Sequence, residues 1–305
     1  MHLRATPYVD EYKPYTAHNG CLPPFWVKKY DEQAKIFWEE FYKRNQDRFF
    51  KDRNYLRNDY ATEISGPNAT AENLGQDRTS PPHFQEFVDS TPESNQVQDF
   101  LQSMQNETHN VVLLEAGCGV GNTIFPLVKV NQNLRVFAFD FSETAVDIVR
   151  KHPLAARGRV TAAVGDLTSG QLPCELACCH ADFATLIFVL SAITPSKMPL
   201  ALQTVGKGLR MGGLVLFRDY AAGDGAQRRF QASGGTKRLD SELPFFVRGD
   251  GTQAYYFSEE ELCSLFQECG FDRVSLVREE RLTANRKTGE CVGRLYWVGK
   301  FRKTS

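Results

Sequence analysis

The middle of the chain alternates between short apolar runs and amphipathic segments. The apolar runs expected as strands are residues 111–117, 134–140, 159–166, 181–190 and 214–220. The segments expected as helices between them are residues 123–130, 142–151 and 196–209. Strands that alternate with helices pair in parallel through right-handed crossovers. We therefore predict an α/β fold with a doubly wound, Rossmann-like, mostly parallel sheet covered on both faces.

The pattern changes after residue 220. Residues 244–257 alternate around a glycine turn and predict a hairpin. Ser258, with Glu261 three residues later, has the spacing of a capping box that opens a helix. Two further strands are expected near residues 274–281 and 291–301, as an antiparallel terminal hairpin. Five parallel strands followed by such a hairpin fit a class I methyltransferase better than a dehydrogenase.

Three regions are expected along the chain. Residues 1–60 predict an N-terminal arm, extended over its first 30 residues because prolines interrupt its aromatics, and then a lid helix that begins at Asp31. Residues 61–82 are small, polar and acidic, and predict a mobile loop. Residues 83–305 form the expected methyltransferase domain, which a helix near residues 93–104 precedes.

Composition excludes some classes of protein. The chain has 305 residues, of which 42% are hydrophobic and 24% charged, as in ordinary globular proteins. It contains no run of 18 apolar residues and no apolar signal core, so we expect no membrane partner. Its eight cysteines are irregularly spaced and predict reduced thiols, hence a cytoplasmic or nuclear protein.

The net charge of −1 hides a strong asymmetry. Residues 59–109 carry nine acidic residues against the single base Arg78. In contrast, bases outnumber acids in residues 43–57, 207–238 and 278–303. Segregated positive charge is typical of proteins that bind a polyanion, although solvated faces of a neutral protein explain it more simply on charge alone.

A glycine-rich loop follows the first expected strand. Its candidate cofactor-binding residues are Glu115, Gly117, Gly119 and Gly121. The glycines let the backbone turn tightly against a ligand at the carboxyl end of the sheet. A dinucleotide fingerprint requires a small residue where this chain has Asn122, so a nicotinamide cofactor is disfavoured.

Acidic residues end the next two expected strands. Asp140 is placed to accept the hydroxyl groups of a ribose, and Asp166 to accept the exocyclic amine of an adenine. Leu167 and Ile187 are placed to cover the adenine ring from two sides. Each acid alone is commonly a loop or cap residue, but a glycine loop and two acids at three strand ends predict an S-adenosylmethionine site.

The lid helix carries a second candidate feature. Trp38 and Tyr42 are one helical turn apart and lie outside the expected sheet. From the residues alone, core packing explains them slightly better than closure over a cofactor.

Several longer strings resemble the eukaryotic tRNA 3-methylcytidine methyltransferases, in particular the short branch that modifies serine tRNA. They are residues 38–45, 49–53, 114–122, 186–191, 216–220, 246–252 and 291–294, and they span most of the chain. The resemblance implies S-adenosylmethionine-dependent methylation of cytidine 32 in the anticodon loop, with seryl-tRNA synthetase as a possible partner. It also implies contact with the cofactor by Trp38, Tyr42, Gly117, Asp140, Asp166, Leu167 and Ile187.

Residues for the chemistry and for RNA are less clearly marked. Cytosine N3 is nucleophilic without losing a proton, so positioning is expected to matter more than a strong base. Asp219 is a candidate for stabilising the cationic product ring, with a structural ion pair to Arg218 as the equal alternative. The candidates for RNA contact are Lys51, Arg53, Arg218, Arg248 and Arg294.

Two other classes of function stay open on sequence alone. One is a methyltransferase that acts on a protein or small molecule, which does not need segregated basic patches. The other is a non-catalytic scaffold, which does not need an intact set of strand-end residues. No metal is expected, because Cys174, Cys178, Cys179 and His180 have no common zinc-site spacing.

Overall fold

The computed structural model describes residues 20–49, 53, 111–284 and 291–305. The expected acidic loop at 61–82, the expected helix near 93–104 and the RNA candidate Lys51 lie outside these residues.

A seven-stranded sheet forms the centre of the domain. Its strands are β1 (Val111–Ala116), β2 (Leu134–Asp140), β3 (Val160–Val164), β4 (Ala181–Ile187), β5 (Leu209–Tyr220), β8 (Phe271–Ala284) and β9 (Cys291–Lys303). They lie in the order β3-β2-β1-β4-β5-β9-β8. The first five pair in parallel, and β9 runs antiparallel between β5 and β8. The predicted mostly parallel sheet with an antiparallel terminal hairpin is therefore confirmed.

Helices cover both faces of this sheet, and neighbouring strand residues supply the two cores. The covering helices are α6 (Ile124–Val130), α7 (Glu143–Lys151), α8 (Met198–Gly208) and α10 (Glu259–Glu268). Leu113 belongs to a buried cluster with α6 and α7, whereas Leu114 belongs to a cluster with α8 and α10. This alternation follows from the two-residue period of a strand.

Local signals fixed several of these boundaries. Ser142 caps α7, since its hydroxyl accepts a hydrogen bond from the Ala145 amide at 3.2 Å. The capping box of Ser258 and Glu261 opens α10 as predicted. The hairpin expected after residue 244 is formed by β6 (Phe245–Val247) and β7 (Gln253–Tyr255).

The expectation of an extended arm over residues 1–30 is wrong in its described part. Residues Pro24–Glu32 form α1, because proline is favoured in the first turn of a helix, where its missing N–H group costs nothing. The lid helix is consequently two helices, α1 and α2 (Ala34–Asn45), with a break at Gln33.

Three further boundaries differ from expectation. The fourth strand ends at Ile187, three residues early, and β5 begins at Leu209 rather than after a glycine turn. Helix α9 (Gly225–Gln231) was not predicted, although Asp224 caps it through a 2.7 Å bond from the Ala226 amide.

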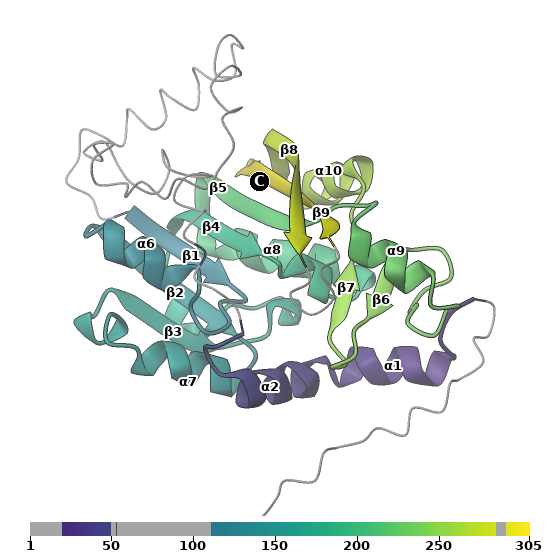
Figure 1. Ribbon diagram of the computed structural model, residues 1–305. Coiled ribbons are helices and arrows are strands. Elements are labelled where there is room, and N and C mark those ends of the chain that lie inside the picture. Colours follow the sequence, from purple (N-terminus) through teal and green to yellow (C-terminus); the bar gives the residue numbers. More distant parts are fainter. Residues whose placement is uncertain (1–19, 50–52, 54–110, 285–290) are drawn as a thin grey trace, which may run out of the picture.

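The two N-terminal helices run one after the other along one edge of the domain (Figure 1). In that view α2 lies beside α7, and α1 passes below β6 and β7. Across the described residues, no helix has the length and apolar character needed to cross a membrane.

Candidate active site

A cavity of about 230 Å³ opens where the carboxyl ends of the parallel strands meet α1 and α2. It lies at the edge of the sheet where open α/β folds bind ligands. Six predicted cofactor residues line it: Trp38, Tyr42, Gly117, Asp140, Asp166 and Leu167. The structure therefore brings together in one cavity residues that are separated by up to 129 positions in the sequence.

The glycine loop forms the floor of this cavity. Gly117 has a φ of 67°, and a Cβ atom there would lie 2.7 Å from the Val189 side chain. Gly119 has a φ of 51°, and a Cβ atom there would lie 2.7 Å from the Tyr42 hydroxyl. Both the backbone conformation and the close neighbours therefore require glycine at these positions.

Two backbone amides hold the Asp140 carboxylate in place. One carboxylate oxygen accepts a hydrogen bond from the Gly119 amide and the other from the Ser142 amide, both at 2.9 Å. The side chain is 6% exposed. Burial raises the pKa of Asp140 to about 6, against the lowering effect of these backbone hydrogen bonds. Each oxygen keeps a second lone pair that can accept a ribose hydroxyl.

Asp166 follows the neighbouring strand β3 but is held differently. One of its carboxylate oxygens accepts hydrogen bonds from the Thr168 amide at 2.8 Å and the Thr168 hydroxyl at 2.7 Å. The residue is exposed, whereas the adjacent Leu167 is buried and gives the cavity an apolar wall. The Asp166 carboxylate can accept a hydrogen bond from the exocyclic amine of an adenine, and the apolar Leu167 side chain can pack against its ring.

The aromatic residues of α2 form the roof. The rings of Trp38 and Tyr42 stack with centroids 5.7 Å apart, and both side chains line the cavity. Trp38 and Tyr42 also contact Phe41, which is buried. The same face of α2 therefore both covers the cavity and packs into the core.

Four predicted cofactor residues do not line the cavity. Ile187 is buried with the α6 cluster on the opposite face, and Phe188 and Val189 take its place as the second apolar wall. Gly119 and Gly121 shape the loop behind Gly117. The fourth, Glu115, lies within β1.

Glu115 belongs to a buried polar cluster behind the glycine loop. Its carboxylate accepts a hydrogen bond from the Thr185 hydroxyl, and burial raises the pKa of Glu115 to about 7. The Arg53 guanidinium acts against this rise, and itself donates to the Thr123 hydroxyl at 3.0 Å and to the Ile187 carbonyl at 3.1 Å. Arg53, predicted to contact RNA, is therefore held against the ends of β4 and the glycine loop.

Arg218 and Asp219 do not form the ion pair considered above, because neighbouring strand residues point to opposite faces. The Arg218 side chain is 1% exposed, and its Nη2 donates a hydrogen bond to Glu279 Oε2 at 2.5 Å, so it is buried against β8; its contact with RNA stays a prediction. Asp219 is buried and accepts 2.9 Å hydrogen bonds from the Ser191 and Tyr220 amides. Burial raises the pKa of Asp219 to about 6. Its catalytic role stays a prediction.

The other two RNA candidates meet beside the cavity. Arg248 and Arg294 lie over the Tyr220 ring, with guanidinium carbons 5.6 Å and 5.3 Å from its centroid. The Tyr220 ring is 5.1 Å from that of Phe188, which lines the cavity. The sequence pointed to the two arginines but not to this aromatic contact, in which Phe188 adopts a left-handed φ of 59°.

Sequence reasoning also missed the contacts that attach the lid helices. Asp31 accepts hydrogen bonds from the Thr194 hydroxyl at 2.6 Å and from Lys197 at 2.7 Å. Glu39 accepts from the Ser142 and Thr144 side chains. Helical spacing alone could have flagged Glu39 as a charge on the buried side of α2, next to Trp38.

The fold and the cavity together indicate the class of protein to which this chain belongs. A glycine loop, a buried acid for a ribose and a second acid with an apolar wall fit S-adenosylmethionine. The family model described as "Methyltransferase domain" matches residues 78–276.

Curated relatives define the family. The "tRNA N(3)-cytidine methyltransferase METTL6" of Mus musculus is 37% identical over 96% of this chain and 89% of its own length. The "tRNA N(3)-methylcytidine methyltransferase trm141" of Schizosaccharomyces pombe is 34% identical over 92% of this chain and 97% of its own. The METTL2 protein of Danio rerio is 35% identical over 92% of this chain and 77% of its own. This chain belongs to the tRNA N(3)-cytidine methyltransferase family of S-adenosylmethionine-dependent enzymes.

Proposed function

We propose that this chain methylates N3 of cytidine 32 in the anticodon loop of serine tRNA. The observation that carries the proposal is the single cavity formed by Gly117, Asp140 and Asp166 in a chain that the tRNA methyltransferase relatives match almost end to end. When bound, S-adenosylmethionine supplies an electrophilic methyl group. The residues of this chain then need to hold the cofactor, place the base and exclude water.

The aromatic and arginine residues beside the cavity suit a target base. Phe188 and Tyr220 offer π faces to a base that has left its stack, as RNA-binding proteins commonly do. Arg248 is placed to offer positive charge to a neighbouring phosphate, whereas the charge of Arg294 is paired with Asp224 at 2.8 Å. Because cytosine N3 has a free lone pair, this site needs to orient the base rather than remove a proton. The buried Asp219, next to Tyr220 in sequence, is the candidate for balancing the positive charge of the product ring.

The decisive experiment uses purified full-length chain and two serine tRNA transcripts, one with cytidine and one with uridine at position 32. Nucleoside mass spectrometry should find 3-methylcytidine only in the first. The Asp140→Ala variant, tested in parallel, should lose activity on the cytidine transcript. Equal methylation of the two transcripts would refute the position, and methylation of neither by a chain that binds the cofactor would favour a protein or small-molecule acceptor.

The partner and the compartment belong to the same proposal. We expect added seryl-tRNA synthetase to raise the methylation rate of serine tRNA and not that of another tRNA with cytidine 32. Seven described cysteines carry free thiols, which supports a cytoplasmic or nuclear location. Imaging of a fluorescently tagged chain tests that location.

A further inference from the structure

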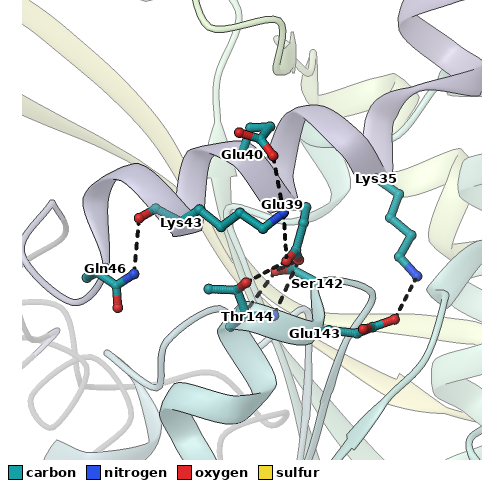
Figure 2. Close-up of polar contacts among 9 residues, drawn as sticks. Lys35, Glu39, Glu40, Lys43, Gln46, Ser142, Glu143 and Thr144 are labelled. Atoms are coloured by element: carbon teal, nitrogen blue, oxygen red, sulfur yellow. Dashed lines mark hydrogen bonds and ion pairs between the residues drawn. The ribbon is translucent and has the colours of Figure 1, made fainter. Parts of the chain in front are cut away.

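Glu39 connects the lid helix α2 to the N-terminus of α7. Figure 2 shows its carboxylate pointing away from α2 toward Ser142 and Thr144. The Ser142 hydroxyl donates to Glu39 Oε2 at 2.6 Å, the Thr144 amide donates to the same oxygen at 3.3 Å, and the Thr144 hydroxyl donates to Oε1 at 2.5 Å. A carboxylate at this place also meets the positive end of the α7 dipole. Glu39 therefore acts as a second cap of α7, supplied from another helix.

Ser142 links Glu39 to Asp140, the predicted ribose acceptor. Its amide donates to Asp140 Oδ1 at 2.9 Å, while its hydroxyl donates to Glu39. One residue thus bonds both the carboxylate inside the cavity and the carboxylate that attaches the lid. On α2, Glu39 directly follows Trp38, whose ring lines the cavity. A movement of α2 away from α7 would therefore displace the Trp38 and Tyr42 rings from the cavity and, through Ser142, alter the hydrogen bonding of Asp140.

We propose that Glu39 is a positioning residue for cofactor binding: it couples closure of Trp38 and Tyr42 over the cavity to the placement of Asp140 through Ser142. The proposal rests on the cavity being the S-adenosylmethionine site. It assigns Glu39 no contact with the cofactor or with RNA.

Electrostatics distinguishes this role from simple attachment of a helix. Burial is the main cause that raises the pKa of Asp140, and the negative charge of Glu39 raises it further. Two other described groups face Asp140: Tyr42 from α2 and Cys118 from the glycine loop. Burial raises the pKa of both well above their ordinary values, so both are neutral between pH 5 and 8.

Glu39 itself stays charged in this range. Burial raises its pKa, but the hydrogen bonds from Ser142 and Thr144 and the nearby charge of Lys43 outweigh that and lower it. Lys43 Nζ lies 3.8 Å from Glu39 on α2, and the Lys35–Glu143 pair, also 3.8 Å apart, lies beside it (Figure 2).

The chain offers a matched control one residue away. Glu40 is on the same helix, its side chain is 58% exposed, and its described ionic contact is with Lys43 at 3.2 Å. Glu39→Gln and Glu40→Gln each remove one negative charge from α2, but only the first alters the contact with α7.

The experiment titrates S-adenosylhomocysteine into the full chain by calorimetry from pH 5.5 to 8, and records the melting temperature of each variant without ligand. Glu39→Ala should weaken binding at pH 7.5 by about tenfold or more, the size expected for losing a charged hydrogen bond. Glu39→Gln keeps an acceptor oxygen and should recover part of this affinity. It should also shift the midpoint of the pH dependence to lower pH, because Asp140 loses a neighbouring negative charge. Glu40→Gln should match the unaltered chain in both measurements.

Three results would overturn the proposal. In the first, Glu39→Ala lowers the melting temperature but leaves the affinity of the folded protein for S-adenosylhomocysteine unaltered. That result would show that Glu39 has a purely structural role. Another is a Glu39→Gln midpoint equal to that of Glu40→Gln. Failure of the unaltered chain to bind S-adenosylhomocysteine would overturn both this proposal and the proposed function, whereas binding that is insensitive to Glu39 would overturn this proposal alone.

Discussion

Asp140 and Asp166 end adjacent strands at the same edge of the sheet, yet the protein treats them differently. Asp140 is 6% exposed and bonded by two amides from separate parts of the chain, those of Gly119 and Ser142. Asp166 is exposed, and the described hydrogen bonds of its carboxylate come from Thr168, two residues away. The comparison indicates that the Asp140 carboxylate is rigid, desolvated and costly to ionise, whereas the Asp166 carboxylate is adjustable and screened by water. We expect the two to contribute unequally to cofactor affinity.

Removal of the buried acid should have the largest effect. Asp140→Ala deletes the predicted ribose acceptor and leaves the Gly119 and Ser142 amides without this partner. Cofactor affinity should fall about tenfold to a hundredfold, since hydrogen bonds to a charged group contribute roughly 1.5–3 kcal/mol. Calorimetry with S-adenosylhomocysteine measures this loss, and an unchanged affinity would remove Asp140 from the site.

Acidification should have the next largest effect, through the same residue. A carboxylate with a pKa of about 6 is mostly protonated at pH 5. If the ionised form accepts the ribose hydroxyls, affinity should fall by up to about tenfold from pH 7 to pH 5. Asp166→Ala should keep this pH dependence and Asp140→Asn should lose it; the reverse pattern would show that the comparison is wrong.

The same protonation affects folding with the opposite sign. The pKa of Asp140 in the folded protein lies above the value of about 3.9 expected in the unfolded chain. The folded state therefore takes up the proton first, and the contribution of Asp140 to stability increases as the pH falls from about 6 to 4. Relative to Asp140→Asn, the unaltered chain should consequently gain in melting temperature over that window, while its cofactor affinity declines.

Removal of the exposed acid should cost less. Asp166→Ala should weaken cofactor binding about twofold to tenfold, the range for one ordinary hydrogen bond of roughly 0.5–1.5 kcal/mol. The melting temperature should hardly change, because the lost contacts are local to Thr168. A loss as large as that of Asp140→Ala would mean that burial does not separate the two acids.

The smallest effect on cofactor affinity is expected from Thr168, which contacts Asp166. Thr168→Ala removes the hydroxyl that donates to Asp166 at 2.7 Å but keeps the Thr168 amide bond in place. We expect less than about a twofold change in affinity in a side-by-side titration, the lower limit for a single exposed hydrogen bond. A larger change would show that Asp166 needs to be held rigidly, as Asp140 is.

Much of the sheet was predictable because its signals are local. The strand Leu134–Asp140 and the helix Glu143–Lys151 lie within a residue of their expected bounds, since an apolar run and a serine cap are visible in a short window. The same holds for the capping box at Ser258. Helix α1 was missed because Pro24 was interpreted as a sign of an extended chain, although proline also starts helices.

The site was predictable only in part, because its remaining features depend on distant contacts. The strand-end acids follow from fold rules, but Glu39 meets its partner Ser142 across 103 positions, and no local pattern records that. Arg218 is a second example. Its sequence neighbourhood does not indicate its depth, and only the pairing of β9 and β8 with β5 reveals that Glu279 covers it.

The order of the strands has a consequence for synthesis of the chain. Strand β9 lies between β5 and β8, although both precede it in sequence. While the nascent chain emerges, the edge of β5 from Leu214 to Tyr220 therefore waits for partner residues that are translated 76 to 88 residues later. Unpaired edges recruit foreign strands, and pairings between distant segments form slowly. We infer that chains halted between β8 and β9 are the form of this protein most exposed to aggregation and most in need of chaperones.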